Sequence, residues 1–153
     1  MPAVRGLVAL SGVFNLERLM RQGGGALAAA SLLPAVFGDD PAQWPQASPT
    51  HILRAHLREQ RKRVLPLQRT PLLLLNAGAD FHLGEDTAEL LALLGEGDGG
   101  GDGRVVHRAA HVVPGTDHIS LVREVGKKAE AEKGGVGVVD DLVFGFVRRV
   151  LQQ

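Results

Sequence analysis

Residues 71–80, PLLLLNAGAD, decide the fold class of this chain. Four consecutive leucines leave no alternation between a buried and a solvated side of a strand. The run therefore predicts a strand over residues 71–76 that is buried on both faces, as strands of a parallel sheet are. The small residues that follow predict a tight turn ending at Asp80.

Leucines at helical spacing predict a helix after this turn. Asp86 and Glu89 have the spacing of an N-terminal capping box, and Gly95 is placed to end the helix. The leucines that share the apolar face of this helix are Leu83, Leu90, Leu91 and Leu94.

Two more apolar runs predict strands at residues 6–12 and 105–110, and residues 13–70 are expected to be helical and irregular. A last helix is expected from one apolar stripe, formed by Val139, Leu142, Val143, Phe146, Val147 and Val150. Strands that alternate with helices favour parallel strands joined by right-handed crossovers. The predicted fold class is α/β.

The composition limits the classes of function. The 153 residues suit one domain or part of a larger one. Lys and Arg together number 17, as do Asp and Glu, so a net charge of zero gives no electrostatic attraction to nucleic acid. The sequence has no Cys, which excludes disulfides, thiol nucleophiles and Cys-ligated metal centres. It has no apolar run of about 18 residues and no signal-peptide pattern, so no membrane span and a cytoplasmic location are expected.

Two residues suited to acid–base chemistry follow predicted strands. Asp80 comes directly after one strand, and His118 follows the next strand after a short loop. The carboxyl ends of parallel strands meet at one rim of a sheet, where neighbouring strands lie about 4.8 Å apart. A carboxylate bonded to an imidazole selects the tautomer of the ring and stabilises the charge gained with a proton. The structural alternatives are a turn residue at Asp80 and a helix-start residue at His118, with Asp117 capping that helix.

Around this pair, the sequence resembles the α/β-hydrolase esterases, in particular the branch of small carboxylesterases, arylformamidases and prenylcysteine methylesterase-like proteins. The similar segments are LSGVFNL at 10–16, DPAQW at 40–44, Ala47-Ser48-Pro49, residues 73–80, and VPGTDHISLV at 113–122. The resemblance implies that Asp80 is the acid and His118 the base of a catalytic triad that uses no cofactor and no metal. It also implies that residues 13–70 form a cap-like excursion.

Members of this fold present a nucleophilic serine in a Gly-x-Ser-x-Gly turn that precedes the acid and the base. That pattern does not occur here, so the chain is expected to correspond to the C-terminal half of such an enzyme, without the N-terminal half of the sheet. Ser11 comes nearest to the pattern, but Val13 stands where it requires Gly, which favours a strand-end turn residue. Ser48 is interpreted as a helix cap and Ser120 as a helix residue.

Three other patterns favour structural roles. His107 and His111 have a spacing that converges on a metal only in a helix, and they lie in a predicted strand. The Gly-x-Gly-x-x-Gly pattern at 95–100 follows a helix instead of a strand, which indicates a flexible connector. A basic cluster without interleaved aromatic residues indicates a solvated helix face, made of Arg54, Arg58, Arg61, Lys62, Arg63 and Arg69.

The expected function is hydrolysis of a carboxylic ester or aryl amide by a serine-type enzyme whose acid and base lie in this chain. The expected partners are a small-molecule ester or amide substrate and a second copy or another chain that completes the sheet at its first strand. The alternative is a catalytically inactive relative of these hydrolases that acts as an interaction module. A domain that binds RNA through the basic cluster is a third alternative.

Overall fold

The computed structural model describes residues 4–21, 32–59, 66–80, 83–96, 106–125 and 136–152. The strands are β1 (Leu7–Leu10), β2 (Leu72–Ala77) and β3 (Arg108–Val113). The helices are α1 (Leu16–Arg21), α3 (Pro49–Glu59), α4 (Leu83–Gly95), α5 (His118–Glu124) and α6 (Val136–Leu151), with short 3-10 helices η1 (Trp44–Ala47) and η2 (Pro66–Arg69). Residues 32–37 are also helical.

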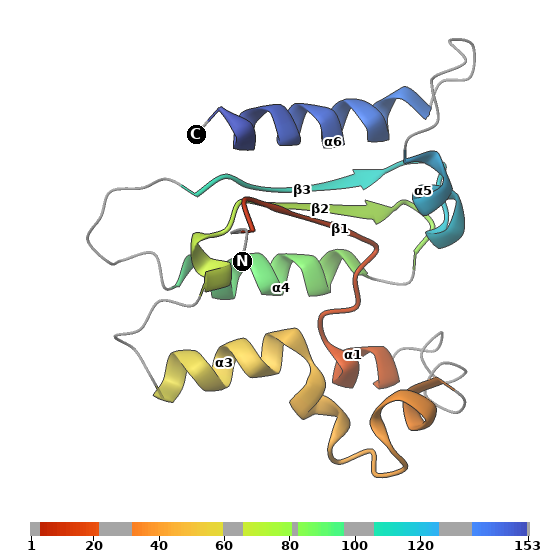
Figure 1. Ribbon diagram of the computed structural model, residues 1–153. Coiled ribbons are helices and arrows are strands. Elements are labelled where there is room, and N and C mark those ends of the chain that lie inside the picture. The colour runs from red at the N-terminus through yellow and green to blue at the C-terminus, as the bar shows by residue number, and fades with distance from the viewer. Residues whose placement is uncertain are drawn as a thin grey trace. The chain divides into compact units, whose positions relative to one another are not determined.

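The three strands form one parallel sheet in the order β1-β2-β3 (Figure 1). Leu72 pairs with Leu7 at the start of β2, and Ala77 pairs with Val113 at its end. All six residues of β2 are buried, because this strand has a neighbour on each edge and apolar side chains on both faces. Figure 1 shows the arrowheads of β2 and β3 pointing to the same end of the sheet, toward α5.

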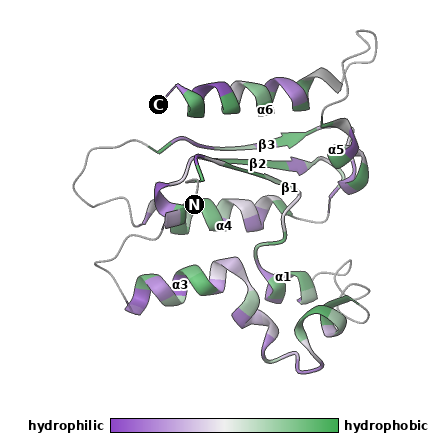
Figure 2. Cartoon of the chain, in the orientation of Figure 1, coloured by the Kyte–Doolittle hydropathy of each residue, from purple (hydrophilic) through white to green (hydrophobic). Residues whose placement is uncertain are grey.

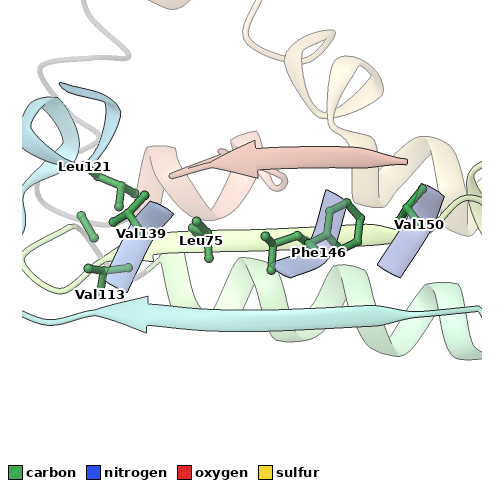
Figure 3. Packing of buried hydrophobic residues seen from close by; sticks show 8 residues of the cluster. Leu75, Val113, Leu121, Val139, Phe146 and Val150 are labelled. Atoms are coloured by element: carbon green, nitrogen blue, oxygen red, sulfur yellow. The ribbon is translucent and has the colours of Figure 1, made fainter. Parts of the chain in front are cut away.

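Helix α6 packs most of its predicted apolar stripe on the sheet (Figure 3). Val147, which was expected in this stripe, is exposed. Figure 2 shows hydrophobic colouring along β2 and alternating colouring along α6, as expected for a buried strand and a half-buried helix. Burial of one Val or Phe side chain stabilises a fold by about 1.5–3 kcal/mol, so this stripe holds α6 in place. The buried cluster consists of Leu73, Leu75, Ala77, Val113, Leu121, Val139, Phe146 and Val150.

The chain divides into two compact units. The first comprises residues 1–12, 69–84 and 103–153 and contains the sheet with α5 and α6. The second comprises residues 13–68 and 85–102 and contains α1, η1, α3 and most of α4. Its own buried cluster is formed by Leu16, Leu33 and Trp44.

The α/β prediction is confirmed at the level of a small parallel sheet flanked by helices. The third strand, however, was predicted at residues 105–110 and lies at Arg108–Val113. Pairing with β2 sets this boundary, because the ladder runs from Leu72 with Arg108 to Ala77 with Val113. A run of Val, Ala and His has no alternation of apolar and polar residues that would fix a register. The bounds of β3 could therefore not be located from the sequence alone.

The capping box predicted at Asp86 and Glu89 is wrong. Helix α4 begins at Leu83, so both residues lie inside the helix and not at its N-terminus. The carboxylate of Asp86 instead accepts hydrogen bonds from backbone amides of a distant segment, which are described with the site below.

Some predicted features lie outside the described residues. These are the connector at 95–100 beyond Glu96 and two parts of the region expected to be helical and irregular, residues 22–31 and 60–65. Within the described ranges, no helix combines the length and the apolar composition needed to cross a membrane.

Candidate functional site

Asp80 lies in the turn that follows β2. Its backbone N–H donates to the carbonyl of Ala77 at 3.2 Å, which closes the turn. Its side chain is only 5% exposed, so the carboxylate lies against the protein and not in open solvent. A carboxylate in such a place needs hydrogen-bonding partners, because its removal from water is otherwise costly.

His118 is the first residue of α5, and a capping box places it there. Asp117 accepts the backbone N–H of Ser120 at 2.7 Å, and the Ser120 hydroxyl accepts the N–H of Asp117 at 2.7 Å. The backbone and then the hydroxyl of Ser120 stabilise the carboxylate and hold the pKa of Asp117 below its ordinary value of 3.8. The prediction that Asp117 caps this helix is confirmed.

The structure brings the Asp80 and His118 side chains together. Nδ1 of His118 lies 3.3 Å from Oδ2 of Asp80, and the His118 side chain is 56% exposed. In the tautomer that makes this contact a hydrogen bond to an ionised carboxylate, Nδ1 carries the proton and Nε2 is the nitrogen that can take one up. This arrangement can remove a proton from a group that reaches the exposed ring.

Two backbone hydrogen bonds join the loops that carry this pair. Gly78 N–H donates to the carbonyl of Val113, and Ala79 N–H donates to the carbonyl of Thr116, each at 2.9 Å. They continue the parallel ladder beyond its last pair, Ala77 with Val113. The two loops are therefore joined to each other beyond the last pair of strand residues.

Ser11 is not exposed in the way that a nucleophile must be. It directly follows β1 with a φ of 45°, and its side chain is buried. Its hydroxyl oxygen accepts the N–H of Ala77 at 3.2 Å, and its own N–H donates to Leu75 at 2.7 Å. These bonds tie the end of β1 to β2, which favours the turn role expected for this residue.

A second cluster of charged groups joins α1 to α4. Arg18 donates to Oδ1 of Asp86 and to Oε2 of Glu89, each at 2.7 Å. Oδ2 of Asp86 accepts the backbone amides of Asn15 at 3.0 Å and Phe14 at 3.3 Å. Both oxygens of this buried carboxylate therefore have partners, which accounts for Asp86 as a structural residue.

Burial by itself lowers the pKa of the Arg18 guanidinium, but the hydrogen bond and charge of Asp86, with the charges of Glu89 and Glu85, raise it above its ordinary value. Arg54 lies against Oε1 of Glu89 as an ion pair without the geometry of a hydrogen bond. Each carboxylate of this cluster is therefore paired with an arginine, Glu89 with two of them. Across the described ranges, no group of three or more His, Asp or Glu side chains is arranged to hold a metal ion.

The other serines have structural partners where the structure describes them. Ser48 stands just before α3, and its backbone carbonyl accepts the N–H of Ile52 at 3.0 Å. Its hydroxyl instead accepts the N–H of Leu16 at 2.9 Å, in a neighbouring segment. Ser120 belongs to the capping box of α5. Ser31 lies outside the described residues.

The structure also describes the other two candidate histidines and part of the basic cluster. His107 lies just before β3, and its ring centroid is 5.9 Å from that of Phe146. His111 lies within β3 and is exposed. In the basic cluster, Arg54 is paired with Glu89, and residues 61–63 lie outside the described residues.

Sequence reasoning missed the bonds between the two loops and the near-complete burial of the Asp80 carboxylate. The one available signal was Gly78, a glycine in a turn next to a proposed site residue. Nothing in the sequence marked Thr116 as its counterpart. No protein-family model, curated protein or solved structure matches this chain.

Proposed function

We propose that this chain supplies the acid and the base of a serine-type hydrolase of carboxylic esters or aryl amides, built on an α/β-hydrolase fold. The observation that carries the proposal is the 3.3 Å contact between Nδ1 of His118 and Oδ2 of Asp80. The two residues come from loops that follow neighbouring parallel strands, which is where open α/β sheets gather reactive groups.

In the proposed reaction, Asp80 holds the Nδ1–H of His118 and leaves Nε2 to take a proton. Nε2 takes the proton of a serine hydroxyl as its oxygen attacks the carbonyl carbon, and Asp80 stabilises the imidazolium that results. The imidazolium gives this proton to the leaving alcohol or amine as its bond to carbon breaks. Water then repeats the attack on the acyl-enzyme, with His118 again as the base. The reaction needs no metal and no organic cofactor.

The burial of the Asp80 side chain and the exposure of the His118 ring support this assignment. A turn role explains the bond from Asp80 N–H to Ala77, but it does not explain why the carboxylate contacts a ring from another loop. A helix-start role for His118 likewise leaves that contact unexplained. A buried carboxylate that orients an exposed imidazole is what a general base for an incoming hydroxyl requires.

In this proposal the nucleophile lies outside these 153 residues, because they contain no Gly-x-Ser-x-Gly and Ser11 is buried. Strand β1 is where it would join. β1 is paired only with β2 among the described residues, and Leu7 is 43% exposed whereas β2 is wholly buried. A parallel strand paired with β1 would end at the same rim as Asp80 and His118.

The proposal is tested with a fluorophosphonate probe, which reacts with a serine activated by a neighbouring His–Asp pair. The probe is added to a lysate of source cells that produce the protein with an affinity tag, and the labelled peptides are identified by mass spectrometry. We expect one labelled serine, either in a co-purified chain or in a part of the polypeptide beyond these residues.

His118→Ala and Asp80→Asn should slow this labelling, the latter by about 10⁴-fold because the wrong tautomer then predominates. His111→Ala and Asp141→Asn, at exposed positions of β3 and α6, are matched controls that should label at the wild-type rate. Absence of any labelled serine, or labelling that survives both site variants, would contradict the proposal and favour a non-enzymatic interaction module. Labelling of Ser11 would contradict the assignment of the nucleophile to another segment.

A further inference from the structure

We propose that Gly78 and Thr116 are positioning residues, which hold the loops after β2 and β3 at a set separation so that the Asp80–His118 pair is formed before any substrate binds. The catalytic meaning of this inference rests on the proposed function. The pairing itself can be measured in the absence of any activity.

Gly78 allows the closest approach between the two loops. Its N–H donates to the carbonyl of Val113, and a Cβ built on it would lie 3.0 Å from that same oxygen and 3.1 Å from Cα of Pro114. Both atoms belong to the backbone, so neither can turn aside as the end of a flexible side chain does. The φ of Gly78 lies outside the left-handed region, which means that space and not backbone conformation favours glycine here.

Thr116 fastens the second loop to the same carbonyl. Its hydroxyl donates to the oxygen of Val113 at 2.7 Å, and its own carbonyl accepts the N–H of Ala79 at 2.9 Å. Thr116 is buried, so these bonds are shielded from water. The oxygen of Val113 therefore accepts from both loops, from Gly78 on one side and from Thr116 on the other.

The contact between His118 and Asp80 that this arrangement supports can lengthen only slightly before the hydrogen bond is lost. At 3.3 Å, the distance from Nδ1 of His118 to Oδ2 of Asp80 is near the upper end of the range for a hydrogen bond. Ordinary van der Waals contact of a Cβ begins at 3.4 Å, so a side chain at position 78 must move the Val113 loop by several tenths of an ångström. A displacement of that size in the direction that parts the loops breaks the contact.

The tautomer of His118 reports on this pair directly. The 153-residue protein is labelled with ¹⁵N-histidine, and long-range ¹H–¹⁵N NMR spectra are recorded at a pH where the imidazoles are neutral. His118→Gln identifies the signals of the ring. We expect the wild-type ring to carry its proton on Nδ1, because the carboxylate accepts it there, and Asp80→Ala to show the signature of the unpaired ring.

Gly78→Ala and Thr116→Val should lose the Nδ1–H signature while retaining the circular dichroism spectrum and a cooperative melt. Thr116→Ser keeps the hydroxyl and should restore the signature, which a purely steric role of the side chain would not do. Gly95→Ala is the matched glycine control, because a Cβ there meets nothing within 4 Å, and it should show the wild-type tautomer.

A wild-type tautomer in both Gly78→Ala and Thr116→Val would overturn the inference. If Gly78→Ala does not fold, the contrast between Thr116→Val and Thr116→Ser decides it, and equal spectra for these two variants would also overturn it. The test is independent of the proposed function. If no serine is labelled but the tautomer responds as expected, the positioning role stands and the hydrolase assignment fails.

Discussion

Arg18 links residues that no local rule connects. Asp86 and Glu89 lie one turn apart on α4, and their carboxylates both accept from the guanidinium of Arg18 on α1. A planar guanidinium offers two donors at once, and each of these bonds is assisted by charge. The buried Asp86 would otherwise hold an uncompensated charge, which is among the more destabilising arrangements in a protein interior.

We expect Arg18→Met to lower the free energy of unfolding by about 2–4 kcal/mol, because it leaves Asp86, which is 4% exposed, without its cation. Arg21→Met is the matched control, since it removes only an exposed pair with Glu17 on the same helix and should cost about 0.3–0.5 kcal/mol. Urea unfolding followed by circular dichroism measures both values. Equal losses in the two variants would show that the Arg18 cluster does not stabilise the fold.

At the scale of an element, helix α5 depends on the charge of one exposed carboxylate. The amide and hydroxyl of Ser120 lower the pKa of Asp117 from 3.8, so the folded protein favours the ionised cap. A lowered pKa in the folded state gives stability that is present above pH 3.8 and is lost as the pH falls through the folded pKa.

We expect Asp117→Asn to remove this pH dependence, because an amide oxygen caps a helix about as well as a carboxylate and does not titrate in this range. The difference in Tm between the wild type and this variant is measured from neutral pH to below 3.8. As the pH falls and the wild-type cap is protonated, the Tm of the wild type should fall relative to the Tm of Asp117→Asn. A difference that stays constant across this range would contradict the role of the Asp117 charge.

At the scale of the whole molecule, the outer edge of β1 is the feature from which we predict association. The amides of Leu7 and Ser11 donate to the segment of β2, so by alternation the amides of Val8 and Leu10 point away from it. No strand of the described ranges pairs with this outer side. An apolar edge with unpaired amides is a template for pairing with another strand.

We expect the 153-residue protein to self-associate with increasing concentration, measured as molar mass by light scattering after size-exclusion chromatography. Val8→Pro removes an outward amide and should decrease this association. Ala9→Pro, its matched control, removes an amide that faces β2 and should lower the melting temperature without removing the outer edge. A monomer of unchanged mass at high concentration would contradict the prediction.

The sequence by itself determined the α/β arrangement and the rim at which Asp80 and His118 lie. The four leucines of β2 require burial on both faces, and a parallel sheet with helices supplies it. Chain order then places a turn after β2 and a loop after β3 at the same end of the sheet. Both inferences use rules that depend only on neighbours along the chain and on the period of a strand.

Only the tertiary structure decided which partners the polar groups take. Asp86 accepts hydrogen bonds from amides 71 and 72 residues earlier in the chain. No rule based on residue spacing can identify donors at such a separation. The register of β3 and the bond from Gly78 to the Val113 carbonyl arise in the same way, from segments that meet only when folded. The physical reason is that a hydrogen bond depends on distances of about 3 Å in space, whereas sequence patterns encode only which side of an element a residue occupies.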